Sequence, residues 1–314
     1  LYGVADVMAN GQLRTVLSED GTLHGTDLYA SNEEGLSNFE EAGFYTHGLL
    51  EDSLNQVDVV VDCTPPGIDE KNKENLYEPN NVKAIFQGVA SPEIAPVAFN
   101  ADANYEKALG KDFVKVVSCN TTSLSRTMSA VDDSFSIDQA VASLVRRGGD
   151  IAQDSRGPIN STVPVTEVPS HHGPDVQAVM PDLDIKTLAV KVPVTYGHVH
   201  MINAELESDA SEEELKQAFR DQPRVNLISA GDGYSSTGKV HEKMRDLKRS
   251  RSDMPEAGVW EETVTVEGST AYWIHMVHQE SIVVPENIDA IRAMFEMEDK
   301  EASIEKTDET LNQV

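Results

Sequence analysis

A single cysteine near the middle of the chain stands in a setting suited to nucleophilic chemistry. Cys119 follows an apolar run at residues 113–117 that is typical of a buried strand, and a helical pattern begins near Thr122. We therefore expect the thiol at a strand-to-helix turn, where free N–H groups and the helix dipole favour an anion. We predict that Cys119 has a lowered pKa and acts as a nucleophile. An inert buried cysteine is the alternative, and the polar residues around Cys119 argue against it.

Two histidines could serve such a nucleophile. His198 and His200 stand two residues apart in a predicted strand, so both imidazoles should point to the same face. Imidazole titrates near neutrality and is suited to moving a proton at a reacting hydroxyl. One of the two could be a general base and the other a support. His171 and His172 form a second pair, in a proline-rich segment, but no third ligand stands at a suitable spacing for a metal, so none is predicted.

The elements that must position these residues fall into two classes. In the first part of the chain, buried strands predicted at 1–5, 57–63, 82–87 and 113–117 alternate with helices at 33–42, 49–54 and 71–77. This alternation indicates an α/β fold with a doubly wound parallel sheet. Ligands of such folds bind at the carboxyl ends of the strands. Polar and glycine residues stand at four of these ends, which predicts a nucleotide site there: Asp6, Thr64, Pro65, Gly88 and Cys119.

The second part of the chain has a different pattern. Strands are predicted at 140–147, 185–194, 195–206, 259–266 and 271–277, and their alternation favours a mostly antiparallel sheet. Helices are predicted at 212–219, 239–249, 286–298 and 303–311. A loop predicted at 150–175 contains four prolines, and loops of that length in compact domains are usually functional.

The composition limits the partners and the compartment. With 54 acidic and 25 basic side chains in 314 residues, the formal net charge is −29, which argues against nucleic acid and anionic membranes as partners. The acids are spread along the chain, as expected of a cytoplasmic protein from a high-salt cell. The two cysteines offer no disulfide framework, and we find no signal peptide or membrane span.

Several motifs, in order along nearly the whole chain, carry a specific resemblance. They are Asp62-Cys63-Thr64-Pro65-Pro66-Gly67, Phe86-Gln87-Gly88, Ser118-Cys119-Asn120-Thr121-Thr122, Val145-Arg146-Arg147, Gly157-Pro158-Ile159-Asn160-Ser161, Pro169-Ser170-His171-His172-Gly173-Pro174-Asp175-Val176, His198-Val199-His200 and His278-Gln279-Glu280-Ser281-Ile282-Val283-Val284-Pro285-Glu286-Asn287. Together these motifs resemble the archaeal (class II) phosphorylating glyceraldehyde-3-phosphate dehydrogenases.

The resemblance implies a domain plan and an activity. Residues 1–118 would form the NAD(P)-binding Rossmann-like domain, 119–284 an α+β catalytic domain, and 285–314 helices that pack back on the first domain. The family oxidises glyceraldehyde 3-phosphate, with inorganic phosphate and NAD or NADP, through a cysteine thioester. It is tetrameric, so a homotetramer is expected.

The resemblance also assigns roles to individual residues. Cys119 would be the nucleophile, and His198 rather than His200 the base. The substrate-binding residues would be Ser118, Asn120, Thr121, Thr122, His171 and His172. The cofactor-binding residues would be Gly88, Arg147, Gln279, Asp6, Thr64 and Pro65.

Two departures from the family pattern bear on the cofactor. The first strand and the glycine-rich turn that hold the pyrophosphate are missing, which suggests a record truncated by about two dozen residues. The family usually has a lysine just after the second strand, whereas this chain has Asp6. A carboxylate there suits a free ribose 2′-hydroxyl and repels a 2′-phosphate, so Asp6 predicts a preference for NAD; an ordinary surface acid is the alternative.

Three other functions fit parts of the pattern. Another cysteine-dependent semialdehyde or acyl-phosphate dehydrogenase, such as aspartate-semialdehyde dehydrogenase, shares the two-domain plan. A cysteine hydrolase could use Cys119 and His198 without a nicotinamide. A non-catalytic binding module would fit the missing glycine-rich turn.

Overall fold

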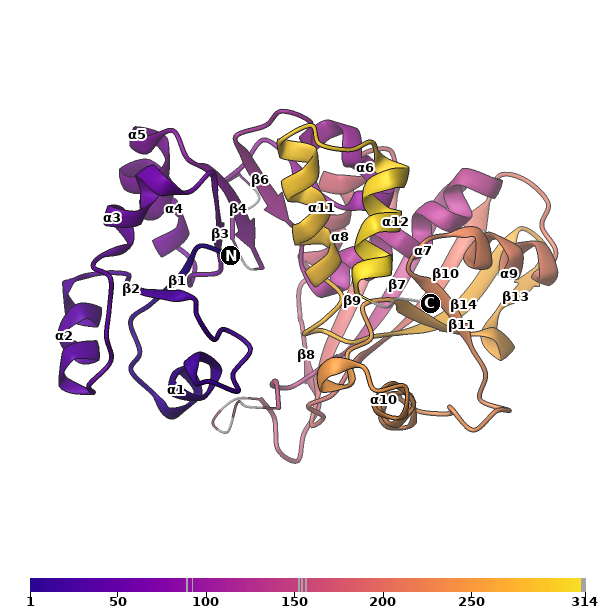
Figure 1. The fold of residues 1–314 in the computed structure, drawn as a ribbon. Helices are drawn as coiled ribbons and strands as arrows, with labels where there is room; N and C mark the ends of the chain where they lie inside the picture. Colours follow the sequence, from indigo (N-terminus) through magenta and orange to yellow (C-terminus); the bar gives the residue numbers. More distant parts are fainter. Residues whose placement is uncertain (89, 92, 152, 154, 156, 312–314) are drawn as a thin grey trace. The chain divides into compact units, whose positions relative to one another are not determined.

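The protein is described here by a computed structural model that covers residues 1–88, 90–91, 93–151, 153, 155 and 157–311. The chain divides into two compact units, Leu1–Ala84 and Ile85–Val314 (Figure 1). The boundary predicted at residue 118 separates a cofactor-binding domain from a catalytic domain rather than two compact units, and it stays a prediction. Within the described residues, no helix is both long and apolar enough to span a bilayer.

The first unit begins with a small parallel pair of strands. Strand β1 (Gly3–Asp6) pairs with β2 (Asp27–Ala30), and their buried side chains pack with helices α1 (Gly11–Leu17) and α2 (Glu33–Glu41). Neither α1 nor β2 was predicted, because both are short, with seven and four residues. The remaining elements of the unit are α3 (Leu50–Ser53), η1 (Leu54–Gln56), β3 (Val59–Asp62), α4 (Ile68–Asn72), the π-helical η2 (Lys73–Tyr77) and α5 (Glu78–Asn80).

A four-stranded sheet has the order β3-β4-β6-β5, and the division between the units falls within its strand β4 (Lys83–Gln87). In the second unit, β5 (Ala98–Phe99) runs parallel to β6 (Phe113–Val116). The prediction of a parallel, Rossmann-like sheet is confirmed, although β1 and β2 form a sheet of their own. The prediction that all of its strands are buried is wrong for β1 and β3, which are only partly buried. The short helices α6 (Ala101–Asn104) and η3 (Tyr105–Ala108) connect β5 to β6.

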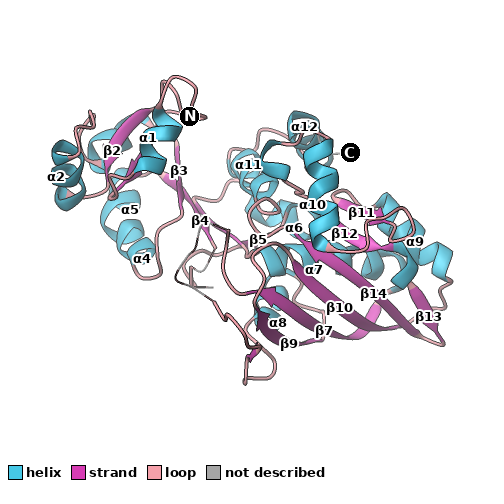
Figure 2. Cartoon of the chain, turned by 90° about the horizontal axis from the view of Figure 1, so that it is seen from below, coloured by secondary structure: helices cyan, strands magenta, loops and turns pink. Residues whose placement is uncertain are grey.

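The second unit is built on an eight-stranded mixed sheet (Figure 2). Its path is β11-β12-β14-β10-β7-β9-β8, with β13 paired to β14. Most pairs are antiparallel, as predicted, but β7–β9 and β11–β12 are parallel. The strands are β7 (Ile137–Arg147), β8 (Val163–Pro164), β9 (Ile185–Val192), β10 (His198–Leu206), β11 (Val225–Ile228), β12 (Ala257–Trp260), β13 (Thr265–Glu267) and β14 (Thr270–Val277).

Three helices cover one face of this sheet: α7 (Cys119–Phe135), α8 (His172–Val179) and α9 (Glu212–Asp221). Their apolar side chains form one core with the inward residues of β7, β9, β10 and β14. Because strand side chains alternate between faces, the residues between them, such as Leu188 and Met201, point away from this core and are exposed. Helix α10 (Thr237–Asp246) packs over part of the opposite face, with Val199 and Ile274.

Two sequence predictions need correction in this unit. The strand predicted at 259–266 is broken by the 3-10 turn η5 (Glu261–Thr263), since β12 and β13 pair at different places along β14. The loop predicted at 150–175 contains β8 and the start of α8. A further turn, η4 (Ser250–Ser252), follows α10.

The last two helices, α11 (Val284–Met294) and α12 (Lys300–Leu311), pack against α6, and α11 also contacts η3 and β6. These partners lie within residues 98–118. The prediction that residues 285–314 pack on a nucleotide-binding domain of residues 1–118 stays a prediction.

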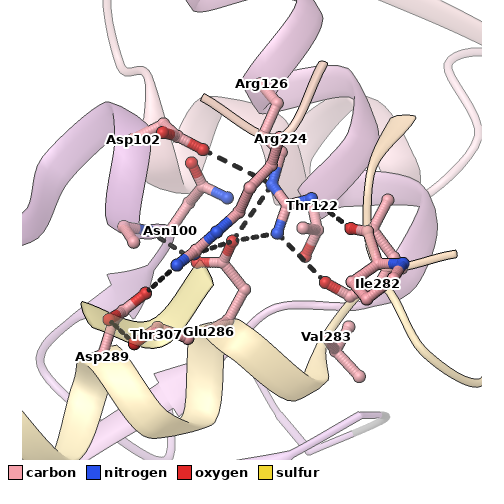
Figure 3. A network of polar contacts seen from close by, with 12 residues as sticks. Asn100, Asp102, Thr122, Arg126, Arg224, Ile282, Val283, Glu286, Asp289 and Thr307 are labelled. Carbon is pink, nitrogen blue, oxygen red and sulfur yellow. Dashed lines mark hydrogen bonds and ion pairs between the residues drawn. The ribbon is translucent and has the colours of Figure 1, made fainter. Parts of the chain in front are cut away.

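A buried charge network ties these helices to α7 (Figure 3). Arg126 of α7 and Glu286 of α11 are fully buried, and Arg126 Nη2 lies 2.6 Å from Glu286 Oε1. Arg126 Nε also lies 3.4 Å from Asp102 Oδ2. Arg224 binds Asp289 at 2.7 Å and Asp308 at 2.6 Å. Through Arg126 the network holds α7 against α6 and α11, and through Arg224 it links α11 to α12. The first residue of α7 is Cys119.

Candidate active site

Helix α7 begins at the cysteine itself. Ser118 is the N-cap; its Oγ accepts a hydrogen bond from the Thr121 backbone N–H at 3.4 Å and lies 3.0 Å from Thr121 Oγ1. Hydroxyl side chains at this position satisfy the free N–H groups of a first turn. The helix starts three residues before the apolar pattern, because its first turn is polar yet buried. The prediction that Cys119 lies at a strand-to-helix turn is confirmed.

The structure brings Cys119 and His198 together. Cys119 Sγ lies 3.5 Å from His198 Nε2. On the other side of the ring, the backbone N–H of Arg147 donates to His198 Nδ1 at 3.0 Å. A backbone amide can only donate, so Nδ1 must hold a lone pair and the proton of a neutral ring must be on Nε2. His198 therefore directs an N–H group at the sulfur.

Burial keeps both groups of this pair neutral. It raises the pKa of the Cys119 thiol, against the opposing pull of Arg147 and Arg146. It lowers the pKa of His198 to about 3, and Arg147 and Arg146 add to that shift. The sequence-based prediction of a lowered cysteine pKa is therefore wrong for this structure, because the helix terminus lies in a poorly solvated site where desolvation is the largest effect.

The pH dependence of alkylation tests this assignment. In a Cys63→Ser variant, where Cys119 is the only thiol, the rate of carbamidomethylation by iodoacetamide should rise about tenfold per pH unit from pH 6 to 8, because only the thiolate reacts. Mass spectrometry of samples quenched at intervals measures the rate. A plateau below pH 7 would show a thiolate–imidazolium pair and contradict the neutral assignment.

Arg147 and Gln279, both predicted near the cofactor, meet through a residue that the sequence analysis missed. Arg147 binds Asp150 with two hydrogen bonds of 2.8 and 3.0 Å, and Gln279 Nε2 donates to the same Asp150 at 3.3 Å. Gln279 Oε1 also accepts from the Gly197 backbone N–H at 3.0 Å, one residue before His198. The sequence places an acid three residues after Arg147, and this spacing could have predicted the ion pair with Asp150.

His171 and His172 lie at the start of α8, where cationic side chains surround them. His172 is 1% exposed, and neither of its ring nitrogens has a hydrogen-bond partner among the described residues. Burial lowers its pKa to about 2, with Arg146 and His171 adding to the shift. Lys115 and Lys191 also act on His171, whose pKa is lowered mainly by burial. The two lysines were not predicted, because they stand on strands rather than in a motif.

The expectation that no third metal ligand accompanies the histidine pair needs correction. His171, His172 and Asp175 each place a possible ligand atom within 4.8 Å of the others. The nearby positive charges of Lys115 and Lys191 nevertheless oppose a divalent cation. Three positive charges, those of Arg146, Lys115 and Lys191, act on His171 against the single negative charge of Asp175, so their sum favours an anion.

The polar residues after the nucleophile are buried rather than open to solvent. Thr121 and Thr122 are fully buried, and Thr122 Oγ1 donates to the Val117 carbonyl at 3.5 Å. Asn120 is 2% exposed, and its Oδ1 lies 3.0 Å from His200 Nε2. Their predicted contacts with substrate stay predictions.

The other predicted cofactor residues do follow strands. Asp6 ends β1 and its Oδ1 accepts from the Val7 backbone N–H at 2.6 Å. Thr64, with Oγ1 2.5 Å from Asp62 Oδ1, and the exposed Pro65 follow β3. Gly88 follows β4 with φ +88°, and among the described residues no atom lies within 4 Å of the place that a Cβ would take. That open space fits the close approach of a ligand.

Comparison with known proteins shows the family of the chain. The model of the glyceraldehyde 3-phosphate dehydrogenase C-terminal domain matches residues 118–251. The chain is 49% identical over 290 residues to a glyceraldehyde-3-phosphate dehydrogenase of Methanobacterium bryantii, which covers 92% of this chain and 86% of the relative. It is 50% identical over 287 residues to the enzyme of that name from Pyrococcus abyssi, covering 91% and 85%. With half of its residues shared over nine tenths of its length, this chain belongs to the glyceraldehyde-3-phosphate dehydrogenase family.

Proposed function

We propose that the chain is an oxidoreductase that converts D-glyceraldehyde 3-phosphate to 1,3-bisphosphoglycerate, with inorganic phosphate and NAD or NADP, through a thioester on Cys119. The observation that carries the proposal is the Cys119–His198 contact of 3.5 Å at the start of a helix. The positive charges of Arg146 and Arg147 act on that thiol, in a chain whose net charge is −29. A substrate that bears a phosphate matches this local excess of positive charge.

The geometry suits an alkoxide intermediate. The Cys119 thiol first loses its proton to solvent. The resulting thiolate attacks the aldehyde carbon and forms a carbon–sulfur bond. The carbonyl oxygen becomes an alkoxide, to which His198 Nε2–H donates a hydrogen bond. Because Nδ1 already accepts from Arg147, a donor role suits His198 better than the base role predicted from the sequence.

The later steps use the same groups. NAD or NADP, when bound, supplies the hydride acceptor that turns the alkoxide into a thioester carbonyl. Gly88 leaves space for such a ligand, and Arg147 and Gln279 are held beside His198. Inorganic phosphate attacks the thioester and releases the Cys119 thiolate, again through an oxyanion that His198 Nε2–H can stabilise. Arg146, His171 and His172 are the proposed anion ligands.

The test is turnover of glyceraldehyde 3-phosphate in concentrated KCl, with NAD and NADP in parallel and with aspartate semialdehyde as a second substrate. We expect NAD(P)H formation with the triose phosphate, and loss of acyl-phosphate formation when phosphate is omitted. Preference for the semialdehyde would support the related dehydrogenase instead. Ester cleavage without NAD(P)H formation would support a cysteine hydrolase and overturn the proposal.

Cofactor preference gives a separate prediction at Asp6. The carboxylate ends β1 and is half-buried, and it should repel the 2′-phosphate of NADP. We expect a higher kcat/KM with NAD than with NADP, and a shift of that ratio toward NADP by about tenfold in Asp6→Ala, corresponding to one lost charge repulsion. Glu19→Ala, which removes another exposed acid of the same unit, is the control. A clear NADP preference of the unmodified protein would defeat the idea.

We further propose a cytoplasmic homotetramer from a high-salt cell. Both cysteines are free, as expected in a reducing compartment. Met201, Ser143 and Leu188 are register neighbours across β10, β7 and β9, and Met201 and Leu188 are 40% and 43% exposed. The two exposed apolar side chains, Met201 and Leu188, support contact with a second copy. Light scattering in concentrated KCl measures the mass.

A further inference from the structure

Four buried polar side chains meet beside the Cys119–His198 pair. Asn120 and Ser123 come from α7, His200 from β10 and His275 from β14, and each is at most 2% exposed. His200 and His275 are opposite each other in the register of the two strands. The ring of His200 also lies parallel to that of His198, with 6.3 Å between their centres. Polar groups are costly to bury in a core, so their presence here needs a reason.

The distances define the direction of the bond to Asn120. His200 Nε2 lies 3.0 Å from Asn120 Oδ1, which can only accept, so the proton of a neutral His200 is on Nε2. His200 Nδ1 must then accept, and two groups are within reach of it: His275 Nε2 at 3.1 Å and Ser123 Oγ at 3.2 Å. Ser123 Oγ also donates to the Asn120 backbone carbonyl at 3.0 Å and lies 3.4 Å from His275 Nε2. His275 Nδ1 has no partner among the described residues.

Both histidines stay neutral, so the bond from His200 Nε2–H to Asn120 Oδ1 keeps its direction over the working pH range. Burial lowers the pKa of His275 to about 3. Burial also lowers the pKa of His200 well below its ordinary value, and the groups that face it, His275, His198, His172 and Arg146, lower it further. The network is therefore a fixed support rather than a proton relay.

The hydrogen bond from His200 determines which end of the Asn120 amide can still bind a ligand. With Oδ1 engaged by His200, Asn120 has only its Nδ2 amide hydrogens left to offer, and the structure gives that group no hydrogen bond within the described part of the chain. Asn120 is the residue directly after the nucleophile. An amide donor held in one orientation is what an oxyanion beside Cys119 needs.

We propose that His200, backed by His275, is a positioning residue that holds Asn120 so that Asn120 Nδ2–H donates to the alkoxide formed on Cys119, alongside His198 Nε2–H. The inference rests on the proposed function. It assigns Asn120 to the reacting oxygen rather than to the substrate phosphate, and it gives His200 and His275 a role in catalysis through Asn120.

A double-mutant cycle tests the assignment. Asn120→Ala should lower kcat about 10²-fold, as is typical for loss of one oxyanion donor, and change KM less than threefold, because the bond forms to the alkoxide rather than to the bound aldehyde. His200→Phe should lower kcat by a similar factor. The double variant should be no slower than Asn120→Ala alone, because His200 acts only through that amide. His200→Gln, which keeps a donor, should recover part of the loss.

Two further measurements separate catalysis from stability. Thr127→Val is the control, because it removes a buried hydroxyl of α7 that bonds only to the helix backbone. This variant should leave kcat unchanged. The thermal midpoint of every variant is measured as well, so that a loss of stability is not taken for a loss of catalysis. In ¹⁵N-edited NMR spectra, His200 should show the neutral Nε2–H tautomer from pH 6 to 8.

The outcomes are distinguishable. Three results would overturn the positioning role while the proposed function stands. They are multiplicative losses of kcat in the double variant, an unchanged kcat in Asn120→Ala, and an Nδ1–H tautomer of His200. Absence of glyceraldehyde 3-phosphate turnover by the unmodified chain would overturn the proposed function and this assignment with it.

Discussion

Replacing Cys119 with serine is expected to lower kcat for glyceraldehyde 3-phosphate about 10⁴-fold or more, as is typical when an enzyme loses its covalent nucleophile. The serine hydroxyl ionises far less readily than a thiol, and the site offers it little help. Here His198 Nε2 points a donor at the nucleophile, and the nearest charges, Arg147 and Arg146, leave even the thiol with a raised pKa. Initial rates of NAD(P)H formation at saturating substrate measure the effect.

The matched control is Cys63→Ser, which changes the other cysteine of the chain and should leave kcat within twofold. Circular dichroism and the thermal midpoint of Cys119→Ser should match the unmodified protein, since serine fits where cysteine stood. Retention of more than one hundredth of the activity by Cys119→Ser would reject a thioester mechanism.

Replacing Arg126 with methionine should cost about 3–5 kcal/mol of unfolding free energy, because removing one partner of a buried ion pair leaves the other charge uncompensated. Arg126 is fully buried and binds Glu286 as well as the Pro255 and Ile282 carbonyls, at 2.6 Å and 3.1 Å. Its loss also removes a charge that opposes the effect of burial on Asp102, whose pKa is raised to about 7. Urea unfolding in concentrated KCl, followed by circular dichroism, measures the change.

The same substitution at an exposed pair is the control. Arg220 and Glu213 form an ion pair at 2.6 Å with side chains 40% and 73% exposed, so Arg220→Met should cost less than about 1 kcal/mol. If Arg126→Met were as mild as Arg220→Met, the buried network would not be what holds α7 in place.

Patterns that repeat along the chain predicted most of the architecture. Apolar runs located β4 and β6, and alternation located β10, because the order of the residues reflects whether one or both faces of a strand are buried. Short elements such as α1 and β2 were missed, since they depend on packing partners that no local window contains. The first turn of α7 was missed for a related reason: its polar residues are buried by contacts with distant strands.

The sequence predicted some residues of the candidate site but not its electrostatics. Cys119 and His198 could be paired from the sequence only through the family resemblance, and the structure places them 3.5 Å apart. The sign of the cysteine pKa shift was wrong, because desolvation depends on everything packed around the sulfur. The sequence did not point to three charged residues near the site, Asp150, Lys115 and Lys191. Their place in the site depends on which strands and loops become neighbours in the fold.

The buried charge network has a consequence for the order in which the protein can be completed. Arg126 lies 160 residues before its counter-charge Glu286, and Arg224 lies 84 residues before Asp308. Contacts between such distant segments form only after the loop-closure entropy has been lost. During synthesis the helix that carries the nucleophile can therefore reach its native contacts only after residues 284–311 have left the ribosome.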